Sequence, residues 1–455
     1  MCESVAREGG RAFVVGGWVR DRLLGLASKD VDMEVYGLEA DVLRRTLRTL
    51  GRVGTVGESF TVYKLFTTDA DGMRFEIDVS LPRRESKSGR GHRGFDVVGD
   101  PHMKMEEAAR RRDFSINAIL YDPLTDTYLD PVDGRADIER RILRAVDSST
   151  FGDDSLRVLR GAQLVARYGL SVEPATEALC RRIPLDDLPA ERVWGEMEKL
   201  LLVARQPSIG LETLRSFGVL TRLFPELEAL EGCPQEPDWH PEGDVWTHTR
   251  LVVDEARLVV DKLDRAGRTT VMLAALCHDL GKPATTRLVD GRIRSLGHDR
   301  AGLDPTARVL DALNIHTIDG YDARHQVLAL VAEHLVPSQL HHDRDRVTDG
   351  AFRRLARRVD CRLLYIVARA DALGRTGAAR NADAQEWFWA RIRELELEHG
   401  APPPLLLGRH VLDLGLRPGP AVGLVTKAVY ELQLDGTVTT VDEAIEAARR
   451  AIADL

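Results

Sequence analysis

The stretch that decides the fold is AFVVGGWVRDRLLGLASKDVDMEV, residues 12–35. Its apolar start ends in Gly16-Gly17, a pattern typical of a strand that turns directly into a helix, and residues 18–24 continue as that helix. Residues 31–35 then alternate polar and apolar side chains, as a half-buried strand does, and residues 74–81 repeat the alternation. We therefore predict an α+β domain at the N-terminus.

Two carboxylates, Asp30 and Asp32, begin the second of these strands. Side chains two apart on a strand point to the same face, with Cα atoms roughly 6–7 Å apart. This spacing lets both carboxylates share divalent cations, and phosphoryl-transfer enzymes use two ions about 3.5–4 Å apart. A lone Asp-x-Asp is common on protein surfaces, so the surrounding residues decide whether this pair is a metal site. If the strand at 74–81 pairs with this one, Glu76 or Asp78 brings a third carboxylate, and we favour Asp78.

The glycine turn suggests a phosphate site. Gly16 and Gly17 allow backbone N–H groups to approach a triphosphate at the start of a helix. Arg20 lies one turn further on, and its guanidinium suits phosphate oxygens. The alternative for the two glycines is a simple tight turn.

Beyond residue 147 the pattern becomes helical. Leu156, Leu159, Ala162 and Val165 recur at helical spacing, and similar patterns continue to about residue 390. Three prolines at 402–404 interrupt them, and turn-forming glycines follow in a small tail. The 455 residues are enough for roughly three or four domains.

Five motifs in order resemble those of the bacterial and eukaryotic class of tRNA CCA-adding enzymes and poly(A) polymerases, within the DNA polymerase β nucleotidyltransferase superfamily. The motifs are GGWVRD (16–21) with DVD (30–32), RRDFSINA (111–118), DPVDGRADIERRILR (130–144), DDSLRVLR (153–160) and ERVWGEMEKLL (191–201). The resemblance implies a small polymerase β-like nucleotidyltransferase head, with a mixed sheet and helices, followed by an all-α neck. It also implies addition of C, C and A to tRNA 3′ ends from CTP and ATP, with two Mg²⁺ ions.

The resemblance assigns roles to residues of the later motifs. Arg112 and Asp113 are implied to contact the sugar and phosphates of the incoming nucleotide. Asp154 and Arg157 are implied to hydrogen-bond its base, and Arg160 completes this nucleotide-binding set. The family usually has Glu-Asp where this chain has Asp-Asp at 153–154, but the base-reading position is the second.

The pair Asp154 and Arg157 makes sense chemically without the resemblance. Residues three apart share one face of a helix, and aspartate accepts hydrogen bonds while arginine donates them. Cytosine and adenine each offer an amino donor beside a ring acceptor, so the pair can select both bases without a template. The alternative is an ordinary salt bridge on a neck helix.

Histidines and aspartates recur along the helical half. The set comprises His248, His278, Asp279 and Asp371. A histidine, a later His-Asp pair and a distant aspartate follow the ligand order of an HD phosphohydrolase-type site, and such ligands suit a divalent ion of unspecified identity. His298 and His334 fall between and can bind a second ion. The alternative is that the histidines cap helices or fill the core. Some CCA-adding enzymes carry an HD domain that resembles a phosphatase or 2′,3′-cyclic phosphodiesterase.

Composition sets further limits. The net charge of −9 argues mildly against a nucleic-acid partner, but basic stretches at 83–93, 110–112 and 140–144 can bind phosphate locally. The segment RRESKSGRGHRGF (83–95) resembles a flexible loop that helps the family switch base preference, and it also suits tRNA backbone binding.

The five scattered cysteines form no CxxC pair, and no stretch approaches the ~20 apolar residues of a membrane span. With a charged N-terminus that lacks a signal-peptide core, we expect a cytoplasmic protein with no membrane partner.

We expect four parts: a catalytic head at 1–145, a base-recognising neck at 146–205, a helical body at 206–395 with the HD domain at about 240–375, and a tail at 400–455. The expected partners are tRNA, CTP and ATP, and the oligomeric state stays open. A poly(A) polymerase, or an enzyme adding only CC or only A, shares the same motifs. A different class of alternative is an HD phosphohydrolase whose N-terminal half serves as an RNA-binding module.

Overall fold

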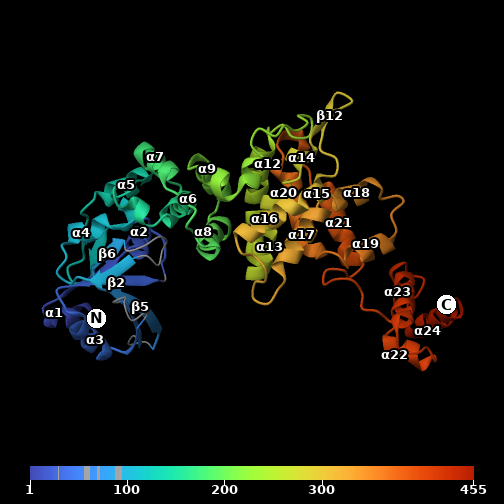
Figure 1. The fold of residues 1–455 in the computed structure, drawn as a ribbon, viewed down its shortest axis with the longest axis horizontal. Helices are drawn as coiled ribbons and strands as arrows, with labels where there is room; N and C mark the ends of the chain where they lie inside the picture. Colours follow the sequence, from blue (N-terminus) through green and yellow to red (C-terminus); the bar gives the residue numbers. More distant parts are fainter. Residues whose placement is uncertain (29, 56–61, 69–71, 88–94) are drawn as a thin grey trace. The chain divides into compact units, whose positions relative to one another are not determined.

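The structure is a computed structural model, and it describes residues 1–28, 30–55, 62–68, 72–87 and 95–455. The chain divides into two compact units, Met1–Leu223 and Phe224–Leu455. The first unit holds a β-sheet and the helices that follow it, and the second is almost entirely helical (Figure 1). The predicted α+β class, a mixed N-terminal sheet followed by helices, is confirmed.

A seven-stranded sheet forms the centre of the first unit, with the strand order β3-β4-β5-β2-β1-β8-β9. Its strands are β1 (Arg11–Val15), β2 (Val31–Tyr36), β3 (Arg52–Thr55), β4 (Val62–Thr68), β5 (Arg74–Ser80), β8 (Leu120–Asp122) and β9 (Thr127–Leu129). All neighbouring strands run antiparallel except β2 and β5, which run parallel. The expected pairing of the 74–81 strand with the Asp32 strand is therefore present.

Strand β1 lies inside the sheet, and four of its five residues are buried. Its side chains Phe13 and Val15 pack with Tyr36, Leu120 and Met103 in one core cluster. A strand covered on both faces needs a continuous apolar run, which explains the sequence AFVV. The helices around this sheet are α1 (Cys2–Arg7), α2 (Gly17–Leu23), α3 (Ala40–Arg48), α4 (Met105–Arg110), α5 (Gly134–Arg140) and the short η1 (Ser115–Asn117).

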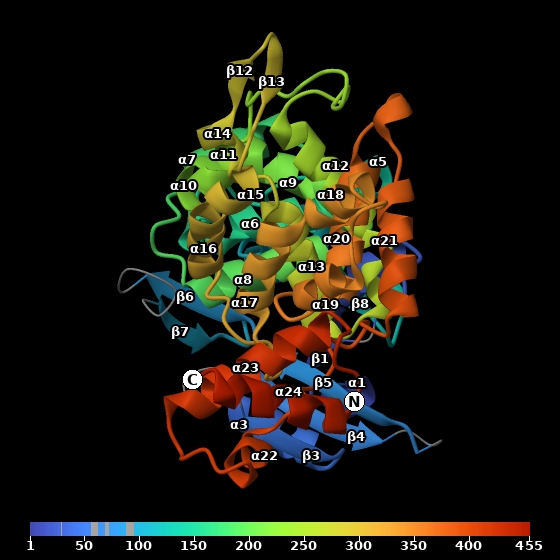
Figure 2. The same ribbon diagram turned by 90° about the vertical axis from the view of Figure 1, so that its right-hand side faces the viewer.

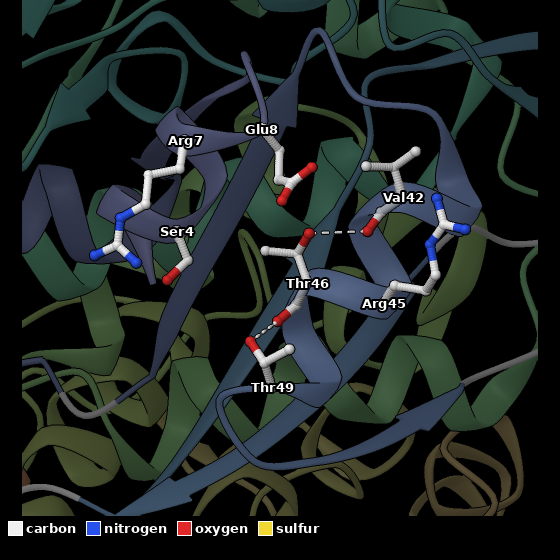
Figure 3. Close-up of a pocket in the computed structure, with 7 residues that line it drawn as sticks. All are labelled: Ser4, Arg7, Glu8, Val42, Arg45, Thr46 and Thr49. Atoms are coloured by element: carbon white, nitrogen blue, oxygen red, sulfur yellow. Dashed lines mark hydrogen bonds between the residues drawn. The ribbon is translucent and has the colours of Figure 1, made fainter.

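A hollow lies between α1 and α3 (Figure 3). Its polar lining includes Ser4, Arg7 and Arg45. The hydroxyls of Thr46 and Thr49 donate to backbone carbonyls of their own helix, over 3.0 and 2.7 Å. These hydroxyls are therefore used within α3 rather than offered to a ligand.

Two short strands lie at the ends of the segment 83–95, which the sequence analysis expected to be a flexible loop. Strands β6 (Arg83–Lys87) and β7 (Phe95–Gly99) pair antiparallel, and residues 88–94 between them lie outside the described residues. The loop prediction is thus wrong at 83–87 and 95.

A helical segment completes the first unit. It contains η2 (Phe151–Asp153), α6 (Leu156–Tyr168), α7 (Pro174–Arg182), α8 (Ala190–Leu202), α9 (Pro207–Ser216) and α10 (Val219–Leu223), with the short strands β10 (Ile142–Leu143) and β11 (Ser171–Val172). Helix α6 packs against both α8 and α9. A Cβ on Gly210 would lie 2.9 Å from the Cβ of Ala166 and 2.7 Å from Leu200, so glycine allows these three helices to approach closely.

The second unit is built around α13, which packs against α12, α17 and α20. All residues of its last two turns, 271–277, are buried, which explains why this part of the helix is apolar on every side. The elements are α11 (Pro225–Glu228), α12 (Val245–Arg257), η3 (Val260–Lys262), α13 (Arg265–Cys277), α14 (Lys282–Thr285), α15 (His298–Ala301), α16 (Leu303–Ala312), α17 (Ala323–Glu333), α18 (Val336–His342), α19 (Asp349–Leu355), α20 (Cys361–Gly374), η4 (Gly377–Ala379) and α21 (Asp383–Glu394).

A small β-hairpin interrupts these helices, where the sequence analysis expected helix throughout. Strands β12 (Arg287–Val289) and β13 (Arg292–Arg294) pair antiparallel and project from the unit (Figure 2). Asp290 and Gly291 join them with positive φ angles of 51° and 75°, the conformation of a tight Asp-Gly hairpin turn.

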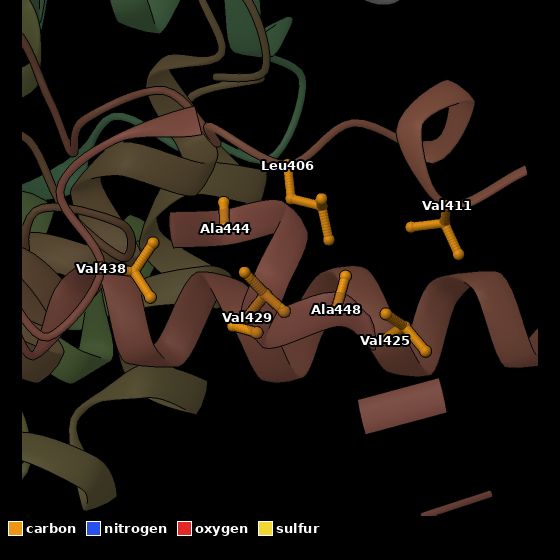
Figure 4. Close-up of a cluster of buried hydrophobic side chains, with 8 residues drawn as sticks. Leu406, Val411, Val425, Val429, Val438, Ala444 and Ala448 are labelled. Atoms are coloured by element: carbon orange, nitrogen blue, oxygen red, sulfur yellow. The ribbon is translucent and has the colours of Figure 1, made fainter. Parts of the chain in front are cut away.

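The tail forms its own cluster of three helices, α22 (Gly408–Asp413), α23 (Pro420–Leu434) and α24 (Val441–Ala453). Val411, Val425, Val429 and Ala448 are among the buried side chains that hold them together (Figure 4). Among the residues that the structure describes, no helix has both the length and the apolar character to cross a membrane.

Candidate active sites

The first site lies where β1, β2 and β5 meet. In the sheet register Asp32 lies opposite Val15 on β1 and opposite Asp78 on β5. A Cβ on Gly16 would lie 3.7 Å from Asp32 Oδ2 and equally far from Arg112 Nη1. The Asp32 carboxylate and the Arg112 guanidinium therefore both lie next to the glycine turn. Asp30 precedes β2 by one residue and is exposed.

These carboxylates repel one another. The pKa of Asp32 is raised, first because the surrounding protein removes water from the carboxyl, and then because Asp78 and Asp30 lie close. The position of Arg112 partly opposes this shift. A cluster of three acidic groups with oxygen ligands fits a divalent cation, which would relieve the repulsion.

Two further side chains, which the sequence analysis did not single out, belong to this site. Lys64 on β4 forms ion pairs with Glu76 and with Asp78, the latter at 3.3 Å. Glu34 accepts hydrogen bonds from Arg112 Nη2 at 3.3 Å and from the Tyr36 hydroxyl at 2.6 Å. Glu34 continues the alternation of Asp30 and Asp32, a signal visible in the sequence, whereas the pairing of Lys64 depends on strand register.

Arg20 lies buried between the head and the neck. Its guanidinium donates to Asn117 Oδ1 at 2.7 Å, to the Tyr168 hydroxyl at 2.5 Å and to Asp21 Oδ1 at 2.8 Å. It also lies over the Tyr168 ring, 4.3 Å from the centroid. These contacts join α2 to η1 and α6, and binding of a phosphate by Arg20 stays a prediction.

Asp113 and Arg160 form a partly buried ion pair across the head and neck, with Asp113 buried and the Arg160 side chain 31% exposed. Arg160 Nη1 donates to Asp113 Oδ2 at 2.9 Å, while Asn117 and the Phe114 backbone donate to Oδ1 at 3.0 and 2.7 Å. Burial alone would raise the pKa of Asp113, but Arg160 and the hydrogen bonds outweigh it and lower the pKa. Arg160 also lies 3.6 Å from Glu196 of α8.

Asp154 and Arg157 do not share a helical face as predicted. Helix α6 begins at Leu156, and Asp154 precedes it in an extended conformation. Arg192 Nη2 donates to Asp154 Oδ2 at 3.3 Å, while Arg157 donates to the carbonyls of Thr150 and Arg111 at 3.0 and 2.7 Å. The expectation failed because η2 ends at Asp153 and α6 begins only at Leu156, so Asp154 lies between the two helical segments.

The second site is a buried cluster in the helical unit. Among the described residues, three groups of potential metal ligands each have donor atoms within 4.8 Å of one another, and two of them contain the predicted residues: His248, His278 and Asp371 form one, and Asp279, His298 and His334 form the other. Asp279 links them, since its Oδ2 lies 3.2 Å from His278 Nε2 and its Oδ1 lies 3.3 Å from His298 Nε2. All six predicted residues thus come together, from helices α12, α13, α15, α17 and α20 or their ends.

The histidines are oriented as metal ligands. The Nδ1 atoms of His278, His298 and His334 each lie 2.7–2.9 Å from a backbone carbonyl three residues earlier, so each Nδ1 carries the proton and leaves Nε2 as a lone-pair donor. His278 Nε2 is buried, and none of its contacts with the described residues, including Asp279 Oδ2 at 3.2 Å, has the geometry of a hydrogen bond. Burial and the neighbouring histidines lower the pKa of His334 to about 4, so it stays neutral. The cluster therefore fits divalent ions.

The sequence analysis missed Glu242, which supports this cluster from a loop. Its side chain is almost fully buried, and Oε1 lies 2.7 Å from His248 Nδ1 and 2.9 Å from His240 Nδ1. A carboxylate behind a liganding histidine fixes the tautomer and orientation of the ring. A loop position shows no periodicity, so only the nearby histidines hinted at it.

Known proteins share both halves of this arrangement. The poly A polymerase head domain matches residues 12–144, a probable RNA and SrmB-binding site of polymerase A matches 169–230, and the HD domain matches 245–376. A multifunctional CCA protein of Xylella fastidiosa is 37% identical over 382 residues, covering 81% of this chain and 85% of the relative. The chain belongs to the multifunctional CCA protein family.

Solved CCA-adding enzymes share the fold. The Bacillus stearothermophilus enzyme in complex with CTP aligns with a TM-score of 0.65 and 20% identity, over 100% of this chain and 97% of that one. The Thermotoga maritima enzyme complexed with tRNA aligns with a TM-score of 0.60 and 18% identity, over 99% and 93%. The predictions of family, of a nucleotidyltransferase and of an HD domain are confirmed by the matches above.

Proposed function

We propose that this protein extends tRNA 3′ ends by C, C and A, using CTP and ATP as nucleotide donors. The observation that carries the proposal is the meeting of Asp30, Asp32 and Asp78 beside Gly16 and Arg112. The names of the relatives, multifunctional CCA protein and CCA-adding enzyme, agree with it.

Different residues of the head would bind the metal ions and the triphosphate. Asp30, Asp32 and Asp78 would hold two divalent ions, which we propose are Mg²⁺. Bound there, such ions would supply Lewis-acid activation of the attacking hydroxyl and of the leaving pyrophosphate. Gly16 keeps the turn free of a side chain, so a triphosphate can approach its backbone and Arg112.

Base selection would involve an exchange of partners. The Asp154 carboxylate now accepts from Arg192, and Arg157 donates to two carbonyls. A cytosine or adenine whose amino group donates to Asp154 would take the place of Arg192, and its ring nitrogen would accept from Arg157. Arg160, held by Asp113, would lie in the same nucleotide-binding set.

A second function follows from the buried cluster. We propose that its six ligands hold one or two divalent ions and that the HD domain hydrolyses phosphate esters, such as 2′,3′-cyclic phosphates. Each imidazole presents Nε2, and Asp279 bridges the two groups, an arrangement that suits a metal-dependent phosphohydrolase.

The remaining assignments are also proposals. The chain would consist of a head at 1–145, a neck at 146–205, an HD-bearing body at 206–395 and a tail at 400–455. All five cysteines are free, which is typical of a reducing compartment and supports a cytoplasmic location.

Nucleotide incorporation into a tRNA transcript that lacks CCA tests the main proposal. With CTP, ATP and Mg²⁺, we expect product three nucleotides longer and then a halt. Asp30→Ala should abolish addition in a folded protein, because an exposed ligand contributes little to the core, while Asp41→Ala, at an exposed position of α3, should leave addition intact. A long A tract, CC alone or A alone would move the assignment within the family, and an active Asp30→Ala protein would refute it.

A further inference from the structure

Arg375 occupies an unusual place beside the HD cluster. It follows α20 and lies one turn after Asp371, whose Oδ1 is 3.8 Å from Arg375 Nη2. That separation is too long for a strong hydrogen bond. The Nε atom is buried and has no hydrogen-bond partner in the part of the chain that the structure describes. The guanidinium thus brings positive charge and unused donors to the cluster.

The backbone that follows Arg375 is held against the loop that carries Glu242. The backbone N–H of the next residue, Thr376, donates to Glu242 Oε2 at 3.3 Å. A Cβ on Gly377 would lie 4.0 Å from Pro241 Cγ, so the segment after α20 packs against the loop that supports His248. The Arg375 side chain is nevertheless 31% exposed, and a ligand from solvent can reach it.

The other cation of the cluster differs from Arg375. Lys282 Nζ lies 2.7 Å from Asp279 Oδ2 and donates to Gln235 Oε1 at 2.7 Å. Its side chain is 9% exposed, so Lys282 neutralises Asp279 inside the protein. Among the described residues, Arg375 has no such pair of short contacts. A role limited to neutralising Asp371 would leave its remaining N–H groups without a function.

We propose that Arg375 binds the phosphoryl oxygens of the substrate at the HD cluster. A guanidinium carries five N–H donors in a fixed fork that matches phosphate, and its charge complements the anion. Since Arg375 Nη2 lies 3.8 Å from Asp371 Oδ1, these donors are next to one of the proposed metal ligands. This inference rests on the proposed phosphohydrolase function.

Binding of inorganic phosphate tests the inference apart from turnover. The full chain carrying Asp30→Ala, which disables the head site, is loaded with saturating Mn²⁺, and phosphate is titrated by calorimetry and by ³¹P relaxation. We expect Arg375→Gln to weaken phosphate binding about ten- to a hundredfold, the range for a charge-assisted hydrogen bond. Arg375→Lys, which keeps the charge and loses the fork, should recover only part of the affinity.

Arg380→Gln is the matched control, because Arg380 lies on the same segment but already donates to the Leu373 carbonyl and to Glu255. It should bind phosphate like the parent. Mn²⁺ affinity, measured in parallel, separates phosphate binding from a purely structural role. Unchanged phosphate binding in Arg375→Gln, or no binding in the parent, would overturn the inference. Phosphate binding that depends on Arg375 without hydrolysis of 2′,3′-cyclic AMP would support it and count against the proposed hydrolase function instead.

Discussion

Replacing Gly281 with alanine is expected to destabilise the helical unit. Gly281 has an ordinary helical backbone, with φ −84° and ψ −15°, so the cost is one of space alone. The added Cβ would lie 2.0 Å from the His298 carbonyl oxygen and 2.6 Å from the Gly302 nitrogen. Both are backbone atoms that cannot rotate away. Overpacking typically costs ~1–3 kcal/mol, and a clash with backbone belongs at the upper end, about 3 kcal/mol.

The measurement is thermal unfolding of the full chain, followed by tryptophan fluorescence; Trp239, Trp246, Trp387 and Trp389 lie in the second unit. About 3 kcal/mol should lower the Tm of that transition by roughly 6–12 °C. The control is Gly195→Ala within α8, where an added Cβ meets nothing within 4 Å and alanine should stabilise the helix by up to about 1 kcal/mol. A Gly281→Ala protein that unfolds at the parent temperature would refute the reasoning.

Two further changes test the sites. Asp113→Asn should lower the free energy of unfolding by about 2 kcal/mol at pH 7. This is less than the ~3–5 kcal/mol lost when a fully buried ion pair is broken, because Arg160 still has the Glu196 carboxylate 3.6 Å away. The fold lowers the pKa of Asp113, so its stabilising contribution is complete above the ordinary pKa of about 3.9 and is lost in more acidic solution. In urea titrations, the unfolding free energies of the parent and of Asp113→Asn should therefore converge as the pH falls below that value. Glu242→Gln should weaken divalent-metal binding at the HD cluster by about 10–100-fold, because Glu242 orients His248. Competition with a chelator measures this affinity, and CCA addition should stay unchanged. Metal affinity equal to the parent's would contradict the role given to Glu242.

The parts of the fold that follow from residue type were predictable. The apolar run before Gly16, the alternation at 31–35 and the helical spacing in the neck each reflect one-dimensional periodicity. The hairpin formed by β12 and β13 has only three residues per strand, too few for an alternating pattern to stand out. Its Asp290-Gly291 turn was the available signal.

The sites were predictable where the ligand type is unusual, and less so where tertiary contacts decide. The order of histidines and aspartates along the helical half picked out the residues that meet in the buried cluster, whereas the Asp30–Asp32 pair needed the glycine turn and the later motifs as support. Asp154 lies outside α6 because the η2 turn ends just before it, which spacing cannot reveal. The contacts of Arg20 with Asn117 and Tyr168 depend on the packing of head and neck, and Glu242 acts from a loop.

The convergence of six ligands from five helices has a consequence for the lifetime of the protein. An ion that binds the folded cluster and not the unfolded chain stabilises the fold by RT ln(1 + [L]/Kd), about 2.7 kcal/mol at a hundredfold excess over Kd. It would act as a crosslink between helices that lie far apart in the sequence, from His248 to Asp371. The resistance of the helical unit to heat and to proteolysis would therefore rise and fall with the metal supply of the solution.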